Sequence, residues 1–352
     1  MKTLLKWPGG KEKELPIIRE YTPLYTGRYI EPFVGGGAVF FDIKDHKCCI
    51  NDKSQELINF YRCIKTKDID FKRNLYLFIS EFSSLSNFVD EKHATLLDLY
   101  QAKIGLDQFI EKYKESFINI AQNKNEVFIS ELKKNLGSKI KRSQKLEREV
   151  GSISDGDRLD NIESALKSAY YMYIRHLYNR SSEFSLGLQA ALFFFIREFC
   201  YSSMFRYNAA GEFNVPYGGI SYNRKDILRK VDYIFSDEVY QKLSETEVFS
   251  LDFEEFLNLQ NLTQNDFMFL DPPYDTDFST YSQNQFGKAE QERLCDCLKK
   301  TKAKILLIIK NTDFIFDLYK NDFNVTSFDK KYLVSFMNRN NRDVEHLIIK
   351  NY

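Results

Sequence analysis

The residues best suited to chemistry follow a short hydrophobic run at 267–270, where the sequence reads Asp271-Pro272-Pro273-Tyr274. Two prolines cannot continue a central strand, so the chain must leave a sheet directly after this run. In open α/β sheets that carboxyl edge is where ligands bind. The motif therefore suits a planar ring with an amino group: Asp271 and the Pro272 carbonyl would accept its two N–H hydrogens, and Tyr274 would stack on the ring. The alternative is an ordinary Pro-Pro turn.

A glycine-rich turn follows another predicted strand, Tyr29–Phe33, and contains three consecutive glycines at 35–37. Glycines let the backbone approach a ligand that a Cβ atom would exclude, and the first strand-to-helix turn is the nucleotide-binding position of such sheets. Asp52 ends the next predicted strand, where its carboxylate would accept both ribose hydroxyls of an adenosyl ligand. Taken alone, Asp52 would instead be the N-cap of a helix that starts at Lys53.

The N-terminal segment Leu5–Lys11 contains a Gly-Gly pair, which marks a turn, directly before a lysine. The ammonium group of Lys11 could reach an anionic group of a ligand, such as the carboxylate of a methionine moiety.

The segment 205–219 is rich in turn-forming and aromatic residues and carries Arg206. Its pattern predicts a β-hairpin. A plain structural hairpin and a hairpin that contacts nucleic acid are both compatible with these residues.

These four segments, in this order, resemble the Dam-type DNA adenine-N6 methyltransferases. The matching patterns are K-W-x-G-G-K, E-P-F-x-G-x-G with a following Asp, R-Y-N-x-x-G-x-F-N-V-P-Y-G, and D-P-P-Y. The resemblance covers roughly residues 4–61 and 200–352, whereas residues 66–190 match no part of the family. It implies transfer of a methyl group from S-adenosyl-L-methionine to N6 of an adenine that is flipped out of duplex DNA.

The resemblance also implies which residues bind. Asp271, Pro272 and Tyr274 would be catalytic. The cofactor positions would be Trp7, Lys11, Glu31, Phe33, Gly35, Gly37, Asp52, Asp252, Phe253 and Asp271. The DNA-contacting positions would be Lys6, Tyr201, Arg206 and Asn208. The run 202–205 departs from the members of the family that read G-A-T-C.

Other functions are compatible with parts of this pattern. The acceptor of the methyl group could be another planar amine: cytosine N4, an RNA adenine or a protein glutamine amide. Cytosine-N4 enzymes more often have Ser, and glutamine or RNA enzymes Asn, where Asp271 stands. A non-catalytic module that binds DNA or cofactor is the other alternative, and the intact Lys11, Asp52 and 271–274 motif disfavours it.

The surrounding elements alternate between short hydrophobic strands and helical patterns, which predicts an α/β fold. We expect a Rossmann-like methyltransferase sheet with an inserted, mostly helical target-recognition domain. The predicted catalytic, cofactor-binding domain comprises residues 1–61 and 225–352, and the insertion comprises residues 62–224. Within the insertion, the most basic section, 133–148, is interpreted as a solvated helix face in preference to a DNA-contacting stripe.

The amino-acid composition indicates which partners, cofactors and cellular compartment to expect. The formal net charge is +0, so a nucleic-acid partner has to be argued from local clusters. The six cysteines and four histidines show no metal-ligand spacing, and we expect reduced cysteines and no metal. No signal peptide or membrane-spanning run is evident. We expect a cytoplasmic protein of bacterial, archaeal or phage origin that acts on double-stranded DNA in a restriction-modification or a host-marking role. In the first case a cognate restriction endonuclease would act as a separate protein.

Overall fold

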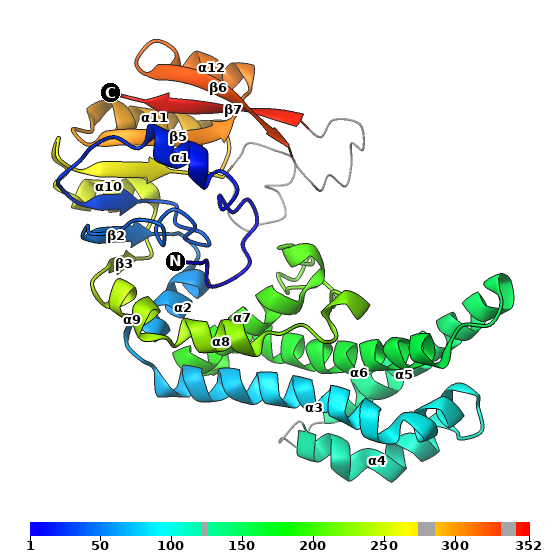
Figure 1. Ribbon diagram of the computed structural model, residues 1–352. Helices are drawn as coiled ribbons and strands as arrows, with labels where there is room; N and C mark the ends of the chain where they lie inside the picture. The colour runs from blue at the N-terminus through cyan, green and yellow to red at the C-terminus, as the bar shows by residue number, and fades with distance from the viewer. Residues whose placement is uncertain (121–125, 274–285, 332–342) are drawn as a thin grey trace. The chain divides into compact units, whose positions relative to one another are not determined.

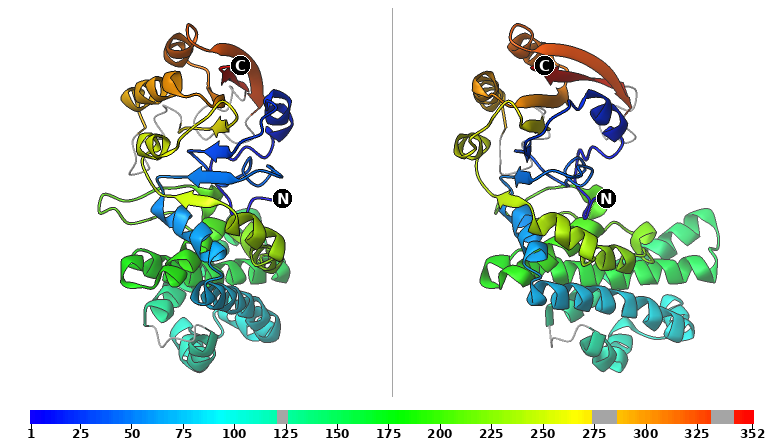
Figure 2. Two further views of the ribbon diagram at one scale, coloured as in Figure 1. Left: turned by 90° about the vertical axis from the view of Figure 1, so that its left-hand side faces the viewer. Right: turned by 60° about the vertical axis from the view of Figure 1, so that its left-hand side comes forward.

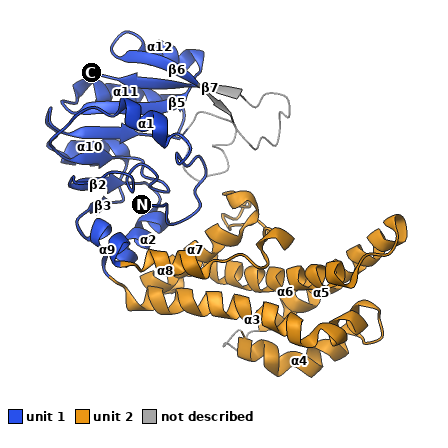
Figure 3. Cartoon of the chain, in the orientation of Figure 1, with its two compact units in different colours: residues 1–66, 237–352 blue, residues 67–236 orange. Residues whose placement is uncertain are grey.

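The computed structural model describes residues 1–120, 126–273, 286–331 and 343–352, and it divides into two compact units (Figures 1 and 3). Unit 1 comprises residues 1–66 and 237–352, and unit 2 comprises residues 67–236. The sequence placed the second boundary at 224/225. It lies later in the structure because helix α8 (Leu228–Ile234) packs on the first helix of unit 2.

Unit 1 is built on a seven-stranded sheet with the order β3-β2-β1-β4-β5-β7-β6. The first five strands in this order are parallel, and β7 runs antiparallel to both β5 and β6. The strands are β1 (Tyr29–Glu31), β2 (Cys48–Asn51), β3 (Glu247–Phe249), β4 (Phe267–Leu270), β5 (Lys304–Lys310), β6 (Asn324–Lys331) and β7 (Asp343–Lys350). The predicted α/β fold is confirmed.

Helices cover both faces of this sheet. They are α1 (Leu15–Tyr21), α2 (Gln55–Lys65), α9 (Asp237–Ser244), α10 (Phe253–Leu259), α11 (Lys288–Lys300) and α12 (Asp313–Tyr319). Figure 2 shows α10 and α11 on one face and α1 on the other. Alternate residues of the central strands, such as Met268 and Leu270 of β4, join α10 and α11 in one apolar cluster. The central strands β1, β2 and β4 are short and fully buried, as expected where a sheet is covered on both faces.

The strand order reverses between β1 and β4, which makes the carboxyl ends of these two strands the switch point of the sheet. Asn51, at the end of β2, ties the neighbouring strand ends together. Its amide nitrogen donates to the carbonyls of Pro32 and Leu251, and its oxygen accepts the N–H of Leu251. These hydrogen bonds fix the backbone from which the loops at this edge of the sheet begin.

Unit 2 is mostly helical, as the sequence predicted. Its helices are α3 (Ile69–Tyr100), α4 (Leu106–Ile120), α5 (Glu126–Val150), α6 (Asp155–Tyr178), α7 (Leu186–Phe199) and α8. Helix α7 is the centre of this bundle: its residues 190–199 are all buried. In the basic section of α5, Lys133, Lys134 and Lys145 are exposed and pair with nearby carboxylates.

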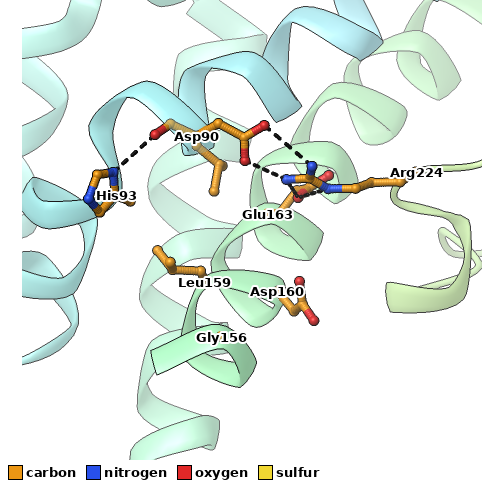
Figure 4. Close-up of a pocket in the computed structure, with 8 residues that line it drawn as sticks. Asp90, His93, Gly156, Leu159, Asp160, Glu163 and Arg224 are labelled. Carbon is orange, nitrogen blue, oxygen red and sulfur yellow. Dashed lines mark hydrogen bonds and ion pairs between the residues drawn. The ribbon is translucent and has the colours of Figure 1, made fainter. Parts of the chain in front are cut away.

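An ion-pair network joins α3, α6 and the segment before α8 beside a pocket of about 330 Å³ (Figure 4). The guanidinium group of Arg224 bridges Asp90 of α3 at 2.7 Å and Glu163 of α6 at 3.0 Å. Glu163 is buried and also accepts the hydroxyl of Ser86. Because Arg224 contacts both helices, we interpret this network as a contact that stabilises the packing of α3 against α6.

Candidate active site

The carboxylate of Asp271, directly after β4, forms an ion pair with the ammonium group of Lys11. Lys11 is 3% exposed and Asp271 is 22% exposed, so the pair is largely withdrawn from water. The lysine also donates to the carbonyl of Gly9, at 3.2 Å, which secures the N-terminal Gly-Gly turn. Two of the four segments identified in the sequence therefore meet at the switch point of the sheet.

A second acidic group, Glu31 at the end of β1, is buried close to this pair. The hydroxyl of Tyr29 donates to its carboxylate at 2.6 Å. Burial raises the pKa of Glu31 well above its ordinary value, and the charges of Asp271 and Asp52 raise it further, whereas the hydrogen bond from Tyr29 opposes the shift. The site thus brings together acidic groups whose ionised forms a cationic ligand would stabilise.

The glycine turn after β1 lies against the indole ring of Trp7. Gly35 has a φ of +48°, and a Cβ atom there would lie 2.8 Å from the indole; a Cβ atom on Gly36 would lie 2.9 Å from the Cβ atom of Trp7. Gly37 also has a positive φ, +72°. The hydroxyl of Tyr61 donates to the carbonyl of Gly35 at 2.8 Å. Gly35 and Gly36 are needed for the packing of Trp7, a reason that the sequence alone did not suggest.

Asp52 follows β2 and faces the same turn. One carboxylate oxygen accepts the N–H of Gly35 at 3.0 Å, and the other accepts the N–H of Ser54 at 2.9 Å. Burial raises the pKa of Asp52, and these two hydrogen bonds oppose that shift. The N-cap of α2 is Ser54, whose hydroxyl accepts the N–H of Leu57, so Asp52 is not the helix cap that was considered as its alternative role.

Aromatic rings form a cluster beside the glycine turn. Phe33 lies 5.6 Å from Phe253 and 5.6 Å from Phe286, measured between ring centroids. Asp252 is the N-cap of α10 and forms an ion pair with Arg293 at 2.8 Å. The guanidinium group of Arg293 also lies over the Phe253 ring, 4.5 Å from its centroid. Asp252 and Phe253, the pair expected to bracket an adenine ring, thus share a basic neighbour that the sequence did not reveal.

The turn after Asp271 is fixed from α11. Pro272 is buried, and the carbonyl of Pro273 accepts a hydrogen bond of 3.1 Å from the amide of Gln291. Tyr274, the expected stacking residue, lies outside the described residues. Within the described parts of the chain there is no group of three or more His, Cys, Asp or Glu residues that could hold a metal ion.

The segment 205–219 contains a hairpin in which Tyr207 pairs with Phe213. Arg206 donates from Nε to the side-chain oxygen of Asn214 at 2.9 Å. The side-chain oxygen of Asn208 accepts the N–H groups of Ala210 and Glu212, so Asn208 is used to close the hairpin turn.

Of the other residues expected to contact DNA, Tyr201 is 43% exposed. Lys6 is partly exposed and belongs to unit 1, whereas Tyr201, Arg206 and Asn208 belong to unit 2. Among helices of the described residues, none is long and apolar enough to span a bilayer.

Comparison with known proteins gives one consistent result. Residues 7–150 and 152–334 match the family described as D12 class N6 adenine-specific DNA methyltransferase. The chain is 28% identical over 358 residues to the Type II methyltransferase M.CviBI of Paramecium bursaria Chlorella virus NC1A, with 100% of both chains covered.

Two further relatives agree with this result. The Type II methyltransferase M1.LlaDCHI of Lactococcus lactis is 24% identical over 100% of this chain and 96% of its own. The DNA adenine methylase of Haemophilus influenzae is 23% identical over 88% of this chain and 79% of its own. The match spans nearly the whole chain and includes the segments that meet around Asp271 and Glu31. The chain therefore belongs to the D12 class N6 adenine-specific DNA methyltransferase family and is an enzyme of that type.

Proposed function

We propose that the enzyme uses S-adenosyl-L-methionine to methylate N6 of an adenine flipped out of duplex DNA at a specific sequence. The observation that supports this most strongly is the position of Asp271. It directly follows β4 at the switch point, is held by Lys11, and stands close enough to Glu31 to influence its pKa.

The acidic character of the site fits this cofactor. S-adenosyl-L-methionine supplies an electrophilic methyl group on a positively charged sulfonium, and its methionine moiety carries an ammonium group. Glu31 and Asp271 would face these charges, Asp52 would accept the ribose hydroxyls, and Lys11 could also attract the methionine carboxylate. The aromatic cluster of Phe33 and Phe253 offers apolar surface for the adenine ring.

The catalytic task of the enzyme is to make an exocyclic amine nucleophilic. The lone pair of the adenine amino group is delocalised into the ring. Hydrogen bonds from its two N–H groups to the carboxylate of Asp271 and the carbonyl of Pro272 would favour a tetrahedral nitrogen and localise the lone pair. The ion pair with Lys11 holds Asp271 before the substrate arrives, so the carboxylate also contributes by its position. We propose that Tyr274 stacks on the flipped base and offsets part of the cost of unstacking it.

We further propose that unit 2 is the target-recognition domain, with Arg206 and Tyr201 as contacts to DNA and with Lys6 contributing from unit 1. Two of the relatives are named Type II methyltransferases. By analogy, we propose that this enzyme protects DNA in a restriction-modification system, together with an endonuclease that acts as a separate protein, in the cytoplasm of a bacterium or archaeon or of a phage-infected cell.

Expression in a bacterium without DNA adenine methylation, followed by single-molecule sequencing, tests this proposal. We expect N6-methyladenine in one short sequence context and unmodified adenines elsewhere. Modified cytosines in place of adenines would support the cytosine-N4 alternative. A purified enzyme that binds DNA and cofactor but leaves all adenines unmodified would contradict the proposal.

A further inference from the structure

The turn that carries the two acceptor groups cannot stabilise itself through backbone N–H groups. Pro272 and Pro273 both lack an N–H, so neither can donate to a neighbouring strand or turn. The described contact that holds the end of this turn comes from α11, where the Nε2 atom of Gln291 donates to the Pro273 carbonyl at 3.1 Å. The carbonyl of Pro273 lies one peptide unit beyond that of Pro272.

Gln291 occupies a position where an apolar residue would pack well. The buried stripe of α11 runs through Gln291, Leu294, Cys295 and Leu298, a spacing of i, i+3, i+4 and i+7. Gln291 is 0% exposed, and its Oε1 atom has no hydrogen-bond partner among the described residues. Burying an amide with an unsatisfied acceptor lowers stability, so a purely structural stripe would favour leucine or methionine at this position.

Helix α11 is fixed firmly enough for its first turn to act as a support. The N–H of Gly287 donates to the carboxylate of Glu290 at 2.8 Å, and the N–H of Gln291 donates to the carbonyl of Gly287 at 3.1 Å. Leu294 and Leu298 anchor the same helix in the apolar cluster that contains Met268 and Leu270 of β4. The helix that supplies the hydrogen bond and the strand that carries Asp271 thus belong to one packed body.

We propose that Gln291 is a positioning residue for methyl transfer. By holding the Pro273 carbonyl, its amide fixes the Pro272 carbonyl and the Asp271 carboxylate in the geometry that receives the two N–H groups of the target amine. The inference rests on the proposed roles of Asp271 and Pro272. It explains why an amide that costs stability stands in an apolar stripe.

The test compares Gln291→Met with Gln291→His in purified full-length enzyme. Methionine keeps the volume and continues the apolar stripe but cannot donate, whereas histidine retains an N–H donor. We expect Gln291→Met to unfold at a urea concentration no lower than wild type, yet to lose about 10- to 100-fold in the single-turnover methylation rate. Its dissociation constants for DNA and cofactor should stay within about threefold. Gln291→His should recover most of the lost rate.

Leu294→Met is the matched control, because it introduces methionine into the same stripe without removing the hydrogen bond, and it should keep the wild-type rate. A second experiment measures the effect of Gln291→Met on the methylation rate in enzyme that already carries Asp271→Asn. Because both substitutions disturb the same turn, the rate loss in the double variant should be smaller than the product of the two single losses. Wild-type rates in Gln291→Met, or losses that multiply fully in the double variant, would overturn the inference. An inactive wild-type enzyme would instead contradict the proposed function.

Discussion

The ammonium group of Lys11 and the carboxylate of Asp271 form an ion pair that joins the N-terminal Gly-Gly turn to the end of β4. Both segments are needed for the site. The N-terminal segment supplies the buried ammonium group of Lys11, and the segment after β4 supplies Asp271, the acceptor expected to bind the target amine. Their pairing keeps an acidic group in place beside Glu31, whose own charge would otherwise disfavour it.

Loss of this pair should destabilise the enzyme even without ligands. Lys11→Met leaves Asp271 without its cation, and we expect the free energy of unfolding to fall by about 1–3 kcal/mol, less than for a fully buried pair because Asp271 is 22% exposed. Adding Asp271→Asn should restore part of the loss. Urea unfolding followed by circular dichroism measures both effects. Lys53→Met, at an exposed position, is the control; an equal loss there would show that the ion pair is unimportant.

Glu31 should make stability depend on pH. Its pKa is raised in the folded state, so its contribution is fully present below the unfolded value of about 4.3 and is lost as the pH rises through the folded pKa. Glu31→Gln should therefore be more stable than wild type at pH 8, and the difference should shrink toward pH 4. Urea midpoints at several pH values measure this. A stability difference that does not change with pH would mean that Glu31 titrates normally.

Asp52 should serve the cofactor and not the DNA. Asp52→Ala removes a charged acceptor. The substitution should weaken the binding of S-adenosyl-L-methionine by about 1.5–3 kcal/mol, or roughly 10- to 100-fold in the dissociation constant, while DNA affinity stays nearly unchanged. Isothermal titration calorimetry gives both constants. Ser54→Ala is the control, because it removes the N-cap of α2 and should lower stability but not cofactor affinity. Unaltered cofactor affinity in Asp52→Ala would refute the ribose assignment.

Arg206 should contribute to DNA recognition. If it reads a base, Arg206→Ala should weaken specific binding by about 1–3 kcal/mol and relax one position of the target site. If it contacts only phosphate, binding should fall evenly across sequences and the salt slope should shrink by about one unit. Fluorescence anisotropy with specific and scrambled duplexes separates these cases. Arg73→Ala, which removes an exposed arginine of α3, is the control. No change relative to that control would place Arg206 away from the duplex.

The sequence predicted the parts of this enzyme that depend on local pattern. The hydrophobic run before Asp271 and the glycines after β1 indicated strand ends at one edge of an α/β sheet, and the helical spacing of unit 2 was equally clear. Contacts between distant segments could not be read from periodicity. Nothing near Lys11 points to Asp271 as its partner, and the contact of Gly35 with Trp7 depends on the folded path of the N-terminus.

Some of the missed residues did leave a signal. Gln291 interrupts an otherwise apolar i, i+3, i+4, i+7 stripe, and a polar residue in such a stripe indicates a specific buried hydrogen bond. The role of Asn51 at the end of β2 was harder to infer, because its three hydrogen bonds reach backbone groups of two other loops. Helix α8 lies in unit 2, and this short helix has no sequence feature that assigns it to either unit.

The central claim is that the carboxylate of Asp271 activates the target amine, and single-turnover methylation of duplex DNA by Asp271→Asn tests it most directly. The substitution is nearly isosteric but replaces a charged acceptor by a weaker neutral one. At saturating cofactor and DNA, we predict a rate at least about 100-fold below that of the wild-type enzyme, equivalent to about 2.7 kcal/mol of transition-state stabilisation. A rate within about threefold of wild type would contradict the account.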